Sequence, residues 1–284
     1  MTHSARPRVP LRWSGRRQLV GDQTLVMGIV NCTPDSFYDG GRHDPAEHYR
    51  QLIAEGADLV DVGGESTRPG AAPVSAEEEW RRVSPVLETA RGEGHPVPLS
   101  IDTTKSEVAA RALDAGAAWI NDVSALREDA ELADLAARYH AGLILMHMRG
   151  TPRTMQRNPT YADVMGEIAR ELADAIARAR ERGVAEEQIV IDPGIGFGKT
   201  AQHNLEIIRR LGELHRLGRP ILMGCSRKSF IGAVQGLEVD ERLESTLAAH
   251  TASVLAGAHI VRVHDVAPHV RAMRMADALL PTEP

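Results

Sequence analysis

Eight short apolar runs recur along this chain, and segments with the periodicity of amphipathic helices separate them. Each run has five to seven residues, and successive runs start 20 to 46 residues apart. Near-continuous apolar runs of this length are typical of parallel strands buried on both faces. The runs are TLVMGIV at 24–30, LVDVG at 59–63, VPLSI at 97–101, AAWIN at 117–121, GLILMH at 142–147, QIVID at 188–192, PILMG at 220–224 and HIVRV at 259–263.

This alternation predicts an α/β fold, a (β/α)8 TIM barrel. Eight strands that alternate with eight helices over about 250 residues match the barrel count. A doubly wound open sheet is the alternative, and the count favours the barrel. No linker rich in Pro, Gly or Ser divides the chain. We therefore expect a single domain over residues 24–284, with residues 1–23 as a short N-terminal extension packed on the barrel.

Composition excludes several classes of protein. The net charge of −6 argues against a nucleic-acid-binding surface, which usually shows a basic excess. Only two cysteines are present, too few for a disulfide framework or a four-cysteine zinc site. No apolar stretch reaches about 18 residues, so we expect no membrane span. The Arg-rich start of the chain lacks the apolar block of a secretory signal, and we expect a cytoplasmic protein.

Lysine is rare in this sequence. Of the 33 basic residues only Lys105, Lys199 and Lys228 are lysines, and all three follow apolar runs. Where arginine supplies the other basic residues, some of these positions can require a compact ammonium group with three rotatable donors.

Polar residues end all eight apolar runs, and in a barrel these ends line the active site. Asp102, Asn121 and Asp192 supply acceptors and an amide, which suit the donor edge of a flat heterocycle such as an aminopyrimidinone. A second group comes from the first and last strands, which are neighbours in a closed barrel. These residues, Asn31, Arg262 and His264, suit a phosphate or pyrophosphate, and Lys228 is expected between the two groups.

Other interpretations of single features are weaker. The segment IDPGIGFGKT resembles a phosphate loop, but Pro193 stands where its first glycine belongs. A zinc site from His147, His264 and an acid, a nucleophilic cysteine and a Schiff base on Lys228 are further alternatives. For Lys228, which lies in a Ser-Arg-Lys-Ser turn, we favour hydrogen bonding. The loops TPDSFYDGGR and GGESTRPGAAP have the composition of substrate lids.

The segments at the strand ends together resemble the dihydropteroate synthase family. They are GIVNCTPDSFYDGG, DVGGESTRPGA, IDTTKSEVA, INDVSAL, LMHMRGTPRTMQ, IDPGIGFGK, GCSRKSFIG and RVHDV, in that order. The resemblance runs from about Thr24 to the C-terminus. It implies a TIM barrel that condenses 6-hydroxymethyl-7,8-dihydropterin pyrophosphate with 4-aminobenzoate in folate synthesis, with Mg²⁺ as cofactor.

The resemblance also assigns residues. The positions implied as catalytic are Asp102, Lys228, Arg262 and Asn31, with Asn31 as the metal contact. It implies a homodimer and sensitivity to sulfonamides, which mimic 4-aminobenzoate. Gly194, Gly196 and Gly198 are expected to let the backbone approach a ring held by Asp192, whereas Lys199 is expected to be a turn residue. The implied contacts are Asp102, Asn121, Val123, Met148, Asp192, Phe197, Gly224, Lys228 and Arg262 for the pterin, Asn31, Arg262 and His264 for the pyrophosphate, and Phe37, Thr67, Arg68, Pro69, Lys228 and Ser229 for 4-aminobenzoate.

Two alternative functions remain. A methyltetrahydrofolate-dependent methyltransferase shares the pterin-holding acids, but the TPDSF and SRKSFIG segments are not expected in it. A barrel that binds a pterin without catalysis is the other, although Asn31, Lys228 and Arg262 are all present.

Overall fold

Eight parallel strands form the centre of the molecule, which we describe from a computed structural model that covers residues 6–33, 44–67 and 70–281. Their order is β8-β7-β6-β5-β4-β3-β10-β9, and a parallel bridge between Ile191 and Ile221 joins the two outer strands. The amide of Ile191 donates to the carbonyl of Pro220 at 3.0 Å, which closes the barrel. The strands are β3 (Leu25–Asn31), β4 (Leu59–Gly63), β5 (Leu99–Asp102), β6 (Trp119–Asp122), β7 (Gly142–Met146), β8 (Ile189–Asp192), β9 (Leu222–Met223) and β10 (Ile260–Val263).

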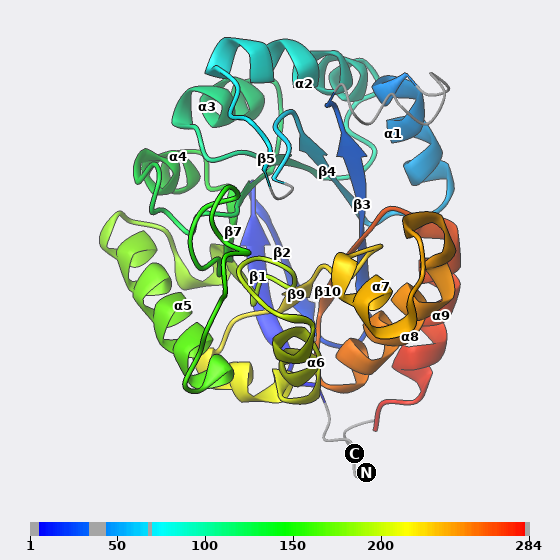
Figure 1. The fold of residues 1–284 in the computed structure, drawn as a ribbon. Coiled ribbons are helices and arrows are strands. Elements are labelled where there is room, and N and C mark those ends of the chain that lie inside the picture. The colour runs from blue at the N-terminus through cyan, green and yellow to red at the C-terminus, as the bar shows by residue number, and fades with distance from the viewer. Residues whose placement is uncertain (1–5, 34–43, 68–69, 282–284) are drawn as a thin grey trace.

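Helices surround the barrel on its outside (Figure 1). The predicted TIM barrel is confirmed, and each of the eight apolar runs contains a strand. The helix α7 was not predicted; its sequence SFIGAVQ is too short to show a helical period. The helices of the described residues are α1 (Pro45–Ala54), α2 (Ala76–Gly92), α3 (Ser106–Asp114), α4 (Glu131–Arg138), α5 (Val164–Glu181), α6 (Ala201–Arg209), α7 (Ser229–Gln235), α8 (Leu243–Leu255) and α9 (Val266–Ala278), with short 3-10 helices at Glu186–Gln188, Leu211–Leu217 and Val239–Glu241.

The start of α2 shows how local sequence sets a helix boundary. Ser75 caps this helix, because its hydroxyl accepts from the amide of Glu78 at 3.2 Å. The spacing of Ser75 and Glu78 also predicts a capping box, but its reciprocal half is wrong, because the Glu78 carboxylate pairs with Arg81 and Arg82 instead. Two guanidinium partners outcompete one backbone amide for the carboxylate. Among the described helices, none is long and apolar enough to cross a membrane.

An antiparallel hairpin closes the amino-terminal end of the barrel. Its strands are β1 (Val9–Trp13) and β2 (Arg16–Val20), drawn in blue in Figure 1. The inner face of the hairpin packs in one apolar cluster with residues of seven barrel strands. The guanidinium of Arg6, 5% exposed, ties the segment down through Thr24, Asp277 and the carbonyls of Gly21 and Ala258. The division of the chain at residue 23 stays a prediction.

Trp119 is the largest fully buried side chain and links the hairpin to the barrel. Its ring lies 5.2 Å from the ring of Trp13, at an angle of 41°. On the neighbouring strand a Cβ on Gly142 would lie 2.0 Å from this ring, so only glycine fits there. The indole therefore fills the base of the barrel, where few other aromatic side chains are available.

Removal of this indole should destabilise the protein strongly. We expect Trp119→Ala to lower the free energy of unfolding by about 3–5 kcal/mol, because it loses buried area and leaves a cavity. Urea unfolding followed by circular dichroism measures the change. Leu19→Ala is the control, since Leu19 is 55% exposed and its loss should change stability by less than about 0.5 kcal/mol. Equal effects of the two substitutions would contradict the assigned role of Trp119.

Candidate active site at the carboxyl ends of the strands

The predicted site residues share one rim of the barrel. In the strand register Asn31 pairs with Gly63, Gly63 with Asp102, and Asp102 with Asn121. Asp192 ends β8 and pairs with Met146. Because β10 pairs with β3, Arg262 and Asn31 come from neighbouring strands, as the sequence predicts. Lys228 follows β9 and directly precedes α7.

A buried charge cluster lies at the centre of this rim. The Nε of Arg262 donates to Asp61 Oδ2 at 2.6 Å, and its Nη2 donates to Asp102 Oδ2 at 2.9 Å. The side-chain amide of Asn121 donates to the same Asp61 oxygen at 2.8 Å. Because the Asn121 nitrogen is engaged, its Oδ1 is left as an acceptor. Arg262, which the sequence groups with the anion-binding residues, thus also contacts Asp102 of the heterocycle group.

The surroundings of Asp102 raise its pKa well above the ordinary value for an aspartate. Burial raises the pKa of Asp102 to about 7, while the charge of Arg262 lowers it and the carboxylates of Asp61 and Glu79 raise it further. Asp61 itself is fully buried, and its Oδ1 finds no hydrogen-bond partner among the described residues. The rim therefore contains two acceptors, on Asn121 and Asp61, that the described protein groups leave unused.

Asp192 and Lys228 form the second polar pair. Oδ1 of Asp192 accepts from the amide of Gly194 at 2.6 Å. The Lys228 ammonium donates to the carbonyl of Ile195 and lies 4.5 Å from the centre of the Phe197 ring. Burial raises the pKa of Asp192, and the charge of Lys228 opposes this effect. Burial lowers the pKa of Lys228 to about 8, against the attraction of Asp192.

The glycines after Asp192 serve the packing of two loops. Gly194 and Gly198 have φ of 69° and 67°, a region that favours glycine. A Cβ on Gly194 would lie 1.9 Å from the carbonyl oxygen of His147, and one on Gly198 would lie 2.4 Å from that of Arg149. The close approach that requires glycine is therefore to the backbone of the β7–α5 loop. The segment is not a phosphate loop.

Apolar side chains form one wall beside these polar groups. Val123, Met146, Met148 and Met155 make a separate buried cluster, and Phe197 packs against it. The structure thus brings together the three apolar residues that the sequence assigns to a ring, namely Val123, Met148 and Phe197. Methionine side chains adapt readily to a flat ligand.

The remaining predicted residues lie on the other side of the rim or outside the described residues. His264 Nδ1 lies 2.9 Å from the hydroxyl of Ser226, which fixes the imidazole beside the start of α7. Gly224 lies next to the Lys228 ammonium, Thr67 is half-buried, and Ser229 opens α7. Phe37, Arg68 and Pro69 lie outside the described residues.

The alternative chemistries find no support in this geometry. His147 contacts Lys199 and Glu171, whereas His264 contacts Ser226, so they do not share a metal site. Within residues 6–33, 44–67 and 70–281 no three His, Cys, Asp or Glu side chains are placed to hold a metal ion. Burial raises the pKa of both Cys32 and Cys225 to about 12, which disfavours a thiolate nucleophile.

Comparison with known proteins identifies the family of this chain. Residues 27–264 match the family described as pterin binding enzyme. The chain is 47% identical to the dihydropteroate synthase of Escherichia coli K12, over 90% of this chain and 91% of that protein. It is 46% identical to the enzyme of Synechocystis, with 91% of each chain covered. This chain belongs to the dihydropteroate synthase family.

Solved structures of this family have the same fold. The Yersinia pestis dihydropteroate synthase in a sulfonamide complex superposes with a TM-score of 0.89 at 40% identity, covering 95% of this chain and 98% of that one. The Xanthomonas albilineans enzyme with 4-aminobenzoic acid gives a TM-score of 0.88 at 43% identity, covering 98% and 100%.

Two features of the family site were not assigned from the sequence. Asp61 joins Arg262 to Asn121, and its signal was a carboxylate within the otherwise apolar strand LVDVG. Lys199 is not a plain turn residue, because it is 3% exposed and contacts His147 and Phe197. Its signal was the rarity of lysine in this chain.

The Arg262 contact predicts how Asp102 titrates. We expect Arg262→Met to move the Asp102 pKa upward from about 7, because the substitution removes the main group that lowers it. Carbon-13 NMR of the Asp carboxyl groups across pH measures the shift. Arg149→Met is the control, since Arg149 pairs with Glu167 and Glu171 instead. An unchanged Asp102 titration in Arg262→Met would contradict the described pairing.

Proposed function

We propose that this chain is a dihydropteroate synthase that condenses 6-hydroxymethyl-7,8-dihydropterin pyrophosphate with 4-aminobenzoate to 7,8-dihydropteroate and pyrophosphate. The proposal rests chiefly on the buried row of acceptors, Asn121 and Asp192, between an apolar wall and the cations Arg262 and Lys228. A site of this kind suits a flat ring with a donor edge and an anionic substituent. The relatives solved with 4-aminobenzoic acid and with pteroic acid support the same substrates.

The pterin would lie against the apolar wall. Asn121 presents Oδ1 because its amide nitrogen is held by Asp61, and Asp192 presents the oxygen that Gly194 does not occupy. These acceptors suit the exocyclic amine and ring N–H groups of an aminopyrimidinone. Lys228 donates on the opposite side to acceptor atoms of the ring. The ring is thereby oriented with its exocyclic methylene toward Arg262.

The chemistry then needs positioning and charge more than proton transfer. The C–O bond to pyrophosphate breaks with its electron pair on the leaving oxygen, and the exocyclic methylene becomes cationic. Asp102, once ionised, stabilises that cation. Two nitrogens of Arg262 are engaged by Asp61 and Asp102, so its Nη1 remains for the pyrophosphate, beside His264 and Asn31. The amine of 4-aminobenzoate attacks the methylene and then releases a proton.

We further propose Mg²⁺ as the cofactor, with Asn31 as its protein contact. Asn31 is half-buried at the end of β3, next to the strand that carries Arg262. A single carboxamide suits Mg²⁺, which keeps several waters and often binds through substrate phosphates rather than in a cage of carboxylates. When bound, the ion neutralises charge on the departing pyrophosphate.

The activity is tested directly with the purified protein. Dihydropterin pyrophosphate, 4-aminobenzoate and Mg²⁺ should give dihydropteroate by chromatography and an equal amount of pyrophosphate, and chelation of the metal should stop both. Lys228→Met should lower kcat/KM for the pterin about 100-fold or more, since a buried donor to the ring is lost. Arg17→Met on the exposed face of β2 is the control and should retain full activity.

Sulfonamides provide a second readout of the same reaction. A sulfonamide should raise the apparent KM for 4-aminobenzoate without changing the maximal rate, because both occupy one pocket. Absence of dihydropteroate with all three components present would refute the proposal. Transfer of a methyl group from methyltetrahydrofolate would then support the methyltransferase alternative, and pterin binding without turnover would support the non-catalytic one.

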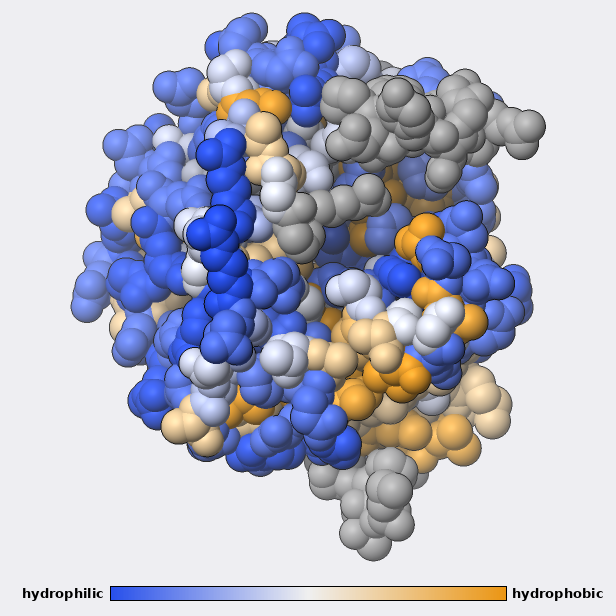
Figure 2. Space-filling model, viewed as in Figure 1, coloured by the Kyte–Doolittle hydropathy of each residue, from blue (hydrophilic) through white to orange (hydrophobic). Residues whose placement is uncertain are grey.

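We also propose that the chain forms a homodimer through the face of α7, α8 and α9. Figure 2 shows apolar side chains gathered where Figure 1 draws these helices. Val234, Val239, Met275 and Leu279 are 46–61% exposed there. After Glu244, the helix α8 carries no Asp, Glu, Lys or Arg, and its exposed positions include Ala248 and Ala252. A cytoplasmic location stays a prediction.

Sedimentation velocity tests this interface. The wild-type chain should sediment as a dimer, and the double substitution Ala248→Glu with Ala252→Glu should give a folded monomer, because like charges would face each other across the symmetric contact. Leu19→Glu on the hairpin is the control and should stay dimeric. A wild-type monomer at micromolar concentration would contradict the proposal.

A further inference from the structure

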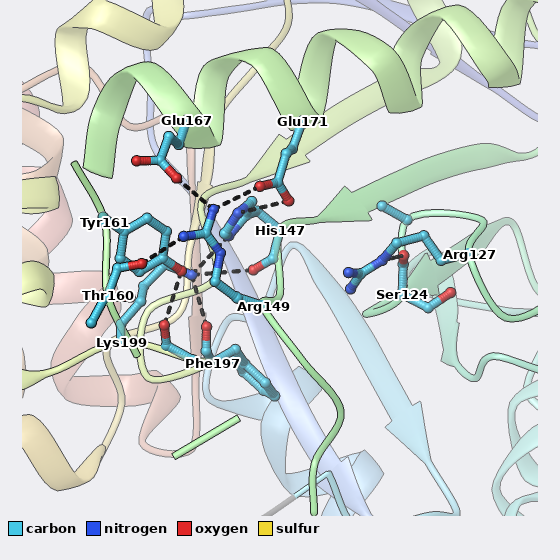
Figure 3. A network of polar contacts seen from close by, with 12 residues as sticks. Ser124, Arg127, His147, Arg149, Thr160, Tyr161, Glu167, Glu171, Phe197 and Lys199 are labelled. Atoms are coloured by element: carbon cyan, nitrogen blue, oxygen red, sulfur yellow. Dashed lines mark hydrogen bonds and ion pairs between the residues drawn. The ribbon is translucent and has the colours of Figure 1, made fainter. Parts of the chain in front are cut away.

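Lys199 is a buried lysine that the proposed reaction does not use. It ends the glycine-rich loop between β8 and α6 and is 3% exposed. Its Nζ lies 2.9 Å from His147 Nδ1, 2.9 Å from the carbonyl oxygen of Phe197 and 3.3 Å from that of His147, as Figure 3 shows. The ammonium therefore has one acceptor for each of its three protons, a fully satisfied arrangement for a buried lysine.

The protonation state of His147 determines whether Nζ of Lys199 donates or accepts in its contact with Nδ1. Its Nε2 lies 3.2 Å from Glu171 Oε2, although it is not aligned as a hydrogen bond. Burial and the charge of Lys199 lower the pKa of His147 to about 4, so the imidazole is neutral near pH 7. A neutral imidazole beside a carboxylate carries its proton on Nε2, which leaves Nδ1 as an acceptor. Nζ of Lys199 must then donate to all three partners.

The three contacts join two loops that carry the ring-binding wall. His147 directly precedes Met148 in the β7–α5 loop, and Phe197 lies in the β8–α6 loop. No other described side chain hydrogen-bonds to both His147 and Phe197. Tyr161 adds a further link, since its hydroxyl donates to the carbonyl of Gly198 at 2.9 Å. Lys199 thus lies behind the wall and holds its two halves together.

The same loop also reaches the polar part of the site. The carbonyl of Ile195 accepts from Lys228, and the Phe197 ring lies under that ammonium at 4.5 Å. A loop displaced by the loss of Lys199 would therefore move both the ring contact and a partner of Lys228. A displacement of about 1 Å at a substrate-positioning group is enough to cost much of the binding.

We infer that Lys199 is a positioning residue for the pterin, holding Met148 and Phe197 at the spacing that a flat ring requires. The inference rests on the proposed function, because it assigns the wall to the pterin of that reaction. Lys199 itself touches neither substrate in this arrangement. Its effect should thus appear chiefly in the binding of the pterin, and be smaller for 4-aminobenzoate, which shares only Lys228 with the displaced loop.

The charge of Lys199 provides a second test, which does not depend on the spacing of the two loops. Burial lowers the pKa of Lys199, and the charges of Asp192 on β8 and Glu171 on α5 oppose this effect. The charges of Lys228 after β9 and Arg149 after β7 lower it further, and His147 beside it is neutral. Asp192 in turn is influenced by Lys228, Lys199 and Arg262, each of which lowers its pKa against the effect of burial. At the acidic pH where Lys199 is protonated, removing its charge should raise the pKa of Asp192 and move the acid limb of pterin binding to higher pH.

The test compares Lys199→Met with Gln188→Met. Both substitutions replace a buried side chain that donates to two or more backbone groups by an apolar one. Gln188 donates to the carbonyls of Ala136 and Ala141 at 3.0 and 2.6 Å, at the opposite end of the barrel. Both variants should lose thermal stability, because buried carbonyls lose their donors. The matched loss of stability separates a positioning role from general loosening.

Only Lys199→Met should change the kinetics. We expect about a tenfold rise in KM for the pterin pyrophosphate, a smaller rise in KM for 4-aminobenzoate, and an acid limb of kcat/KM shifted to higher pH. Unchanged pterin KM and acid limb in Lys199→Met would overturn the inference, and so would equal changes in Gln188→Met. Should the wild type make no dihydropteroate, the proposed function fails, and the same two variants titrated with 6-hydroxymethylpterin in a calorimeter decide the inference.

Discussion

The pairing of Arg262 with Asp61 and Asp102 is the interaction on which the rest of the site depends. Three strands meet through it, since Arg262 comes from β10 and the two acids from β4 and β5. Desolvating such charges costs several kcal/mol for each ion. The attraction between the Arg262 guanidinium and two carboxylates offsets that desolvation. Substitution of one partner leaves the other partners buried without compensation, so the cluster constrains all three strands at once.

The three lysines, like Arg262, lie beside groups that compensate their charge or accept their protons. Lys105 pairs with Glu65 and the fully buried Glu79, Lys228 lies near Asp192, and Lys199 donates to three acceptors. All three ammonium groups thus lie beside acceptors or carboxylates, and the requirement for lysine rather than arginine at these positions stays a prediction. Each lies at the carboxyl ends of the strands, where a flat guanidinium would need more space.

Periodicity was sufficient to predict the barrel, because each strand buries both faces and therefore shows as an apolar run. It missed the hairpin β1–β2, whose second strand, RRQLV, exposes four of its five residues and carries little apolar signal. It also gave no role to Asp61 or Lys199, since the role of each depends on partners far away in the sequence. Asp61 contacts Arg262 across 201 positions, a pairing that only the closed barrel brings about.

The glycines of residues 194–198 show the same limit in another form. Their pattern predicts a close approach of the backbone to a ring held by Asp192, and that contact stays a prediction. In the structure Gly194 and Gly198 approach the backbone of His147 and Arg149, whereas Gly196 lies against the side chain of Lys228.

The two ends of the barrel have different roles: the amino-terminal end stabilises the fold, and the carboxyl-terminal end carries the reactive groups. At the amino-terminal end Trp13 and Trp119 close an apolar cluster with the hairpin. At the other end Asp61 keeps an unsatisfied oxygen and Asp102 has a pKa of about 7, both of which oppose folding in the unliganded protein at neutral pH. Because the pKa of Asp102 is raised, its contribution to stability falls as pH rises from about 4 through 7. The apolar cluster at the amino-terminal end offsets the destabilisation by Asp61 and Asp102. The hairpin, although distant from the site, thereby helps the fold to tolerate the buried carboxylates that the reaction requires.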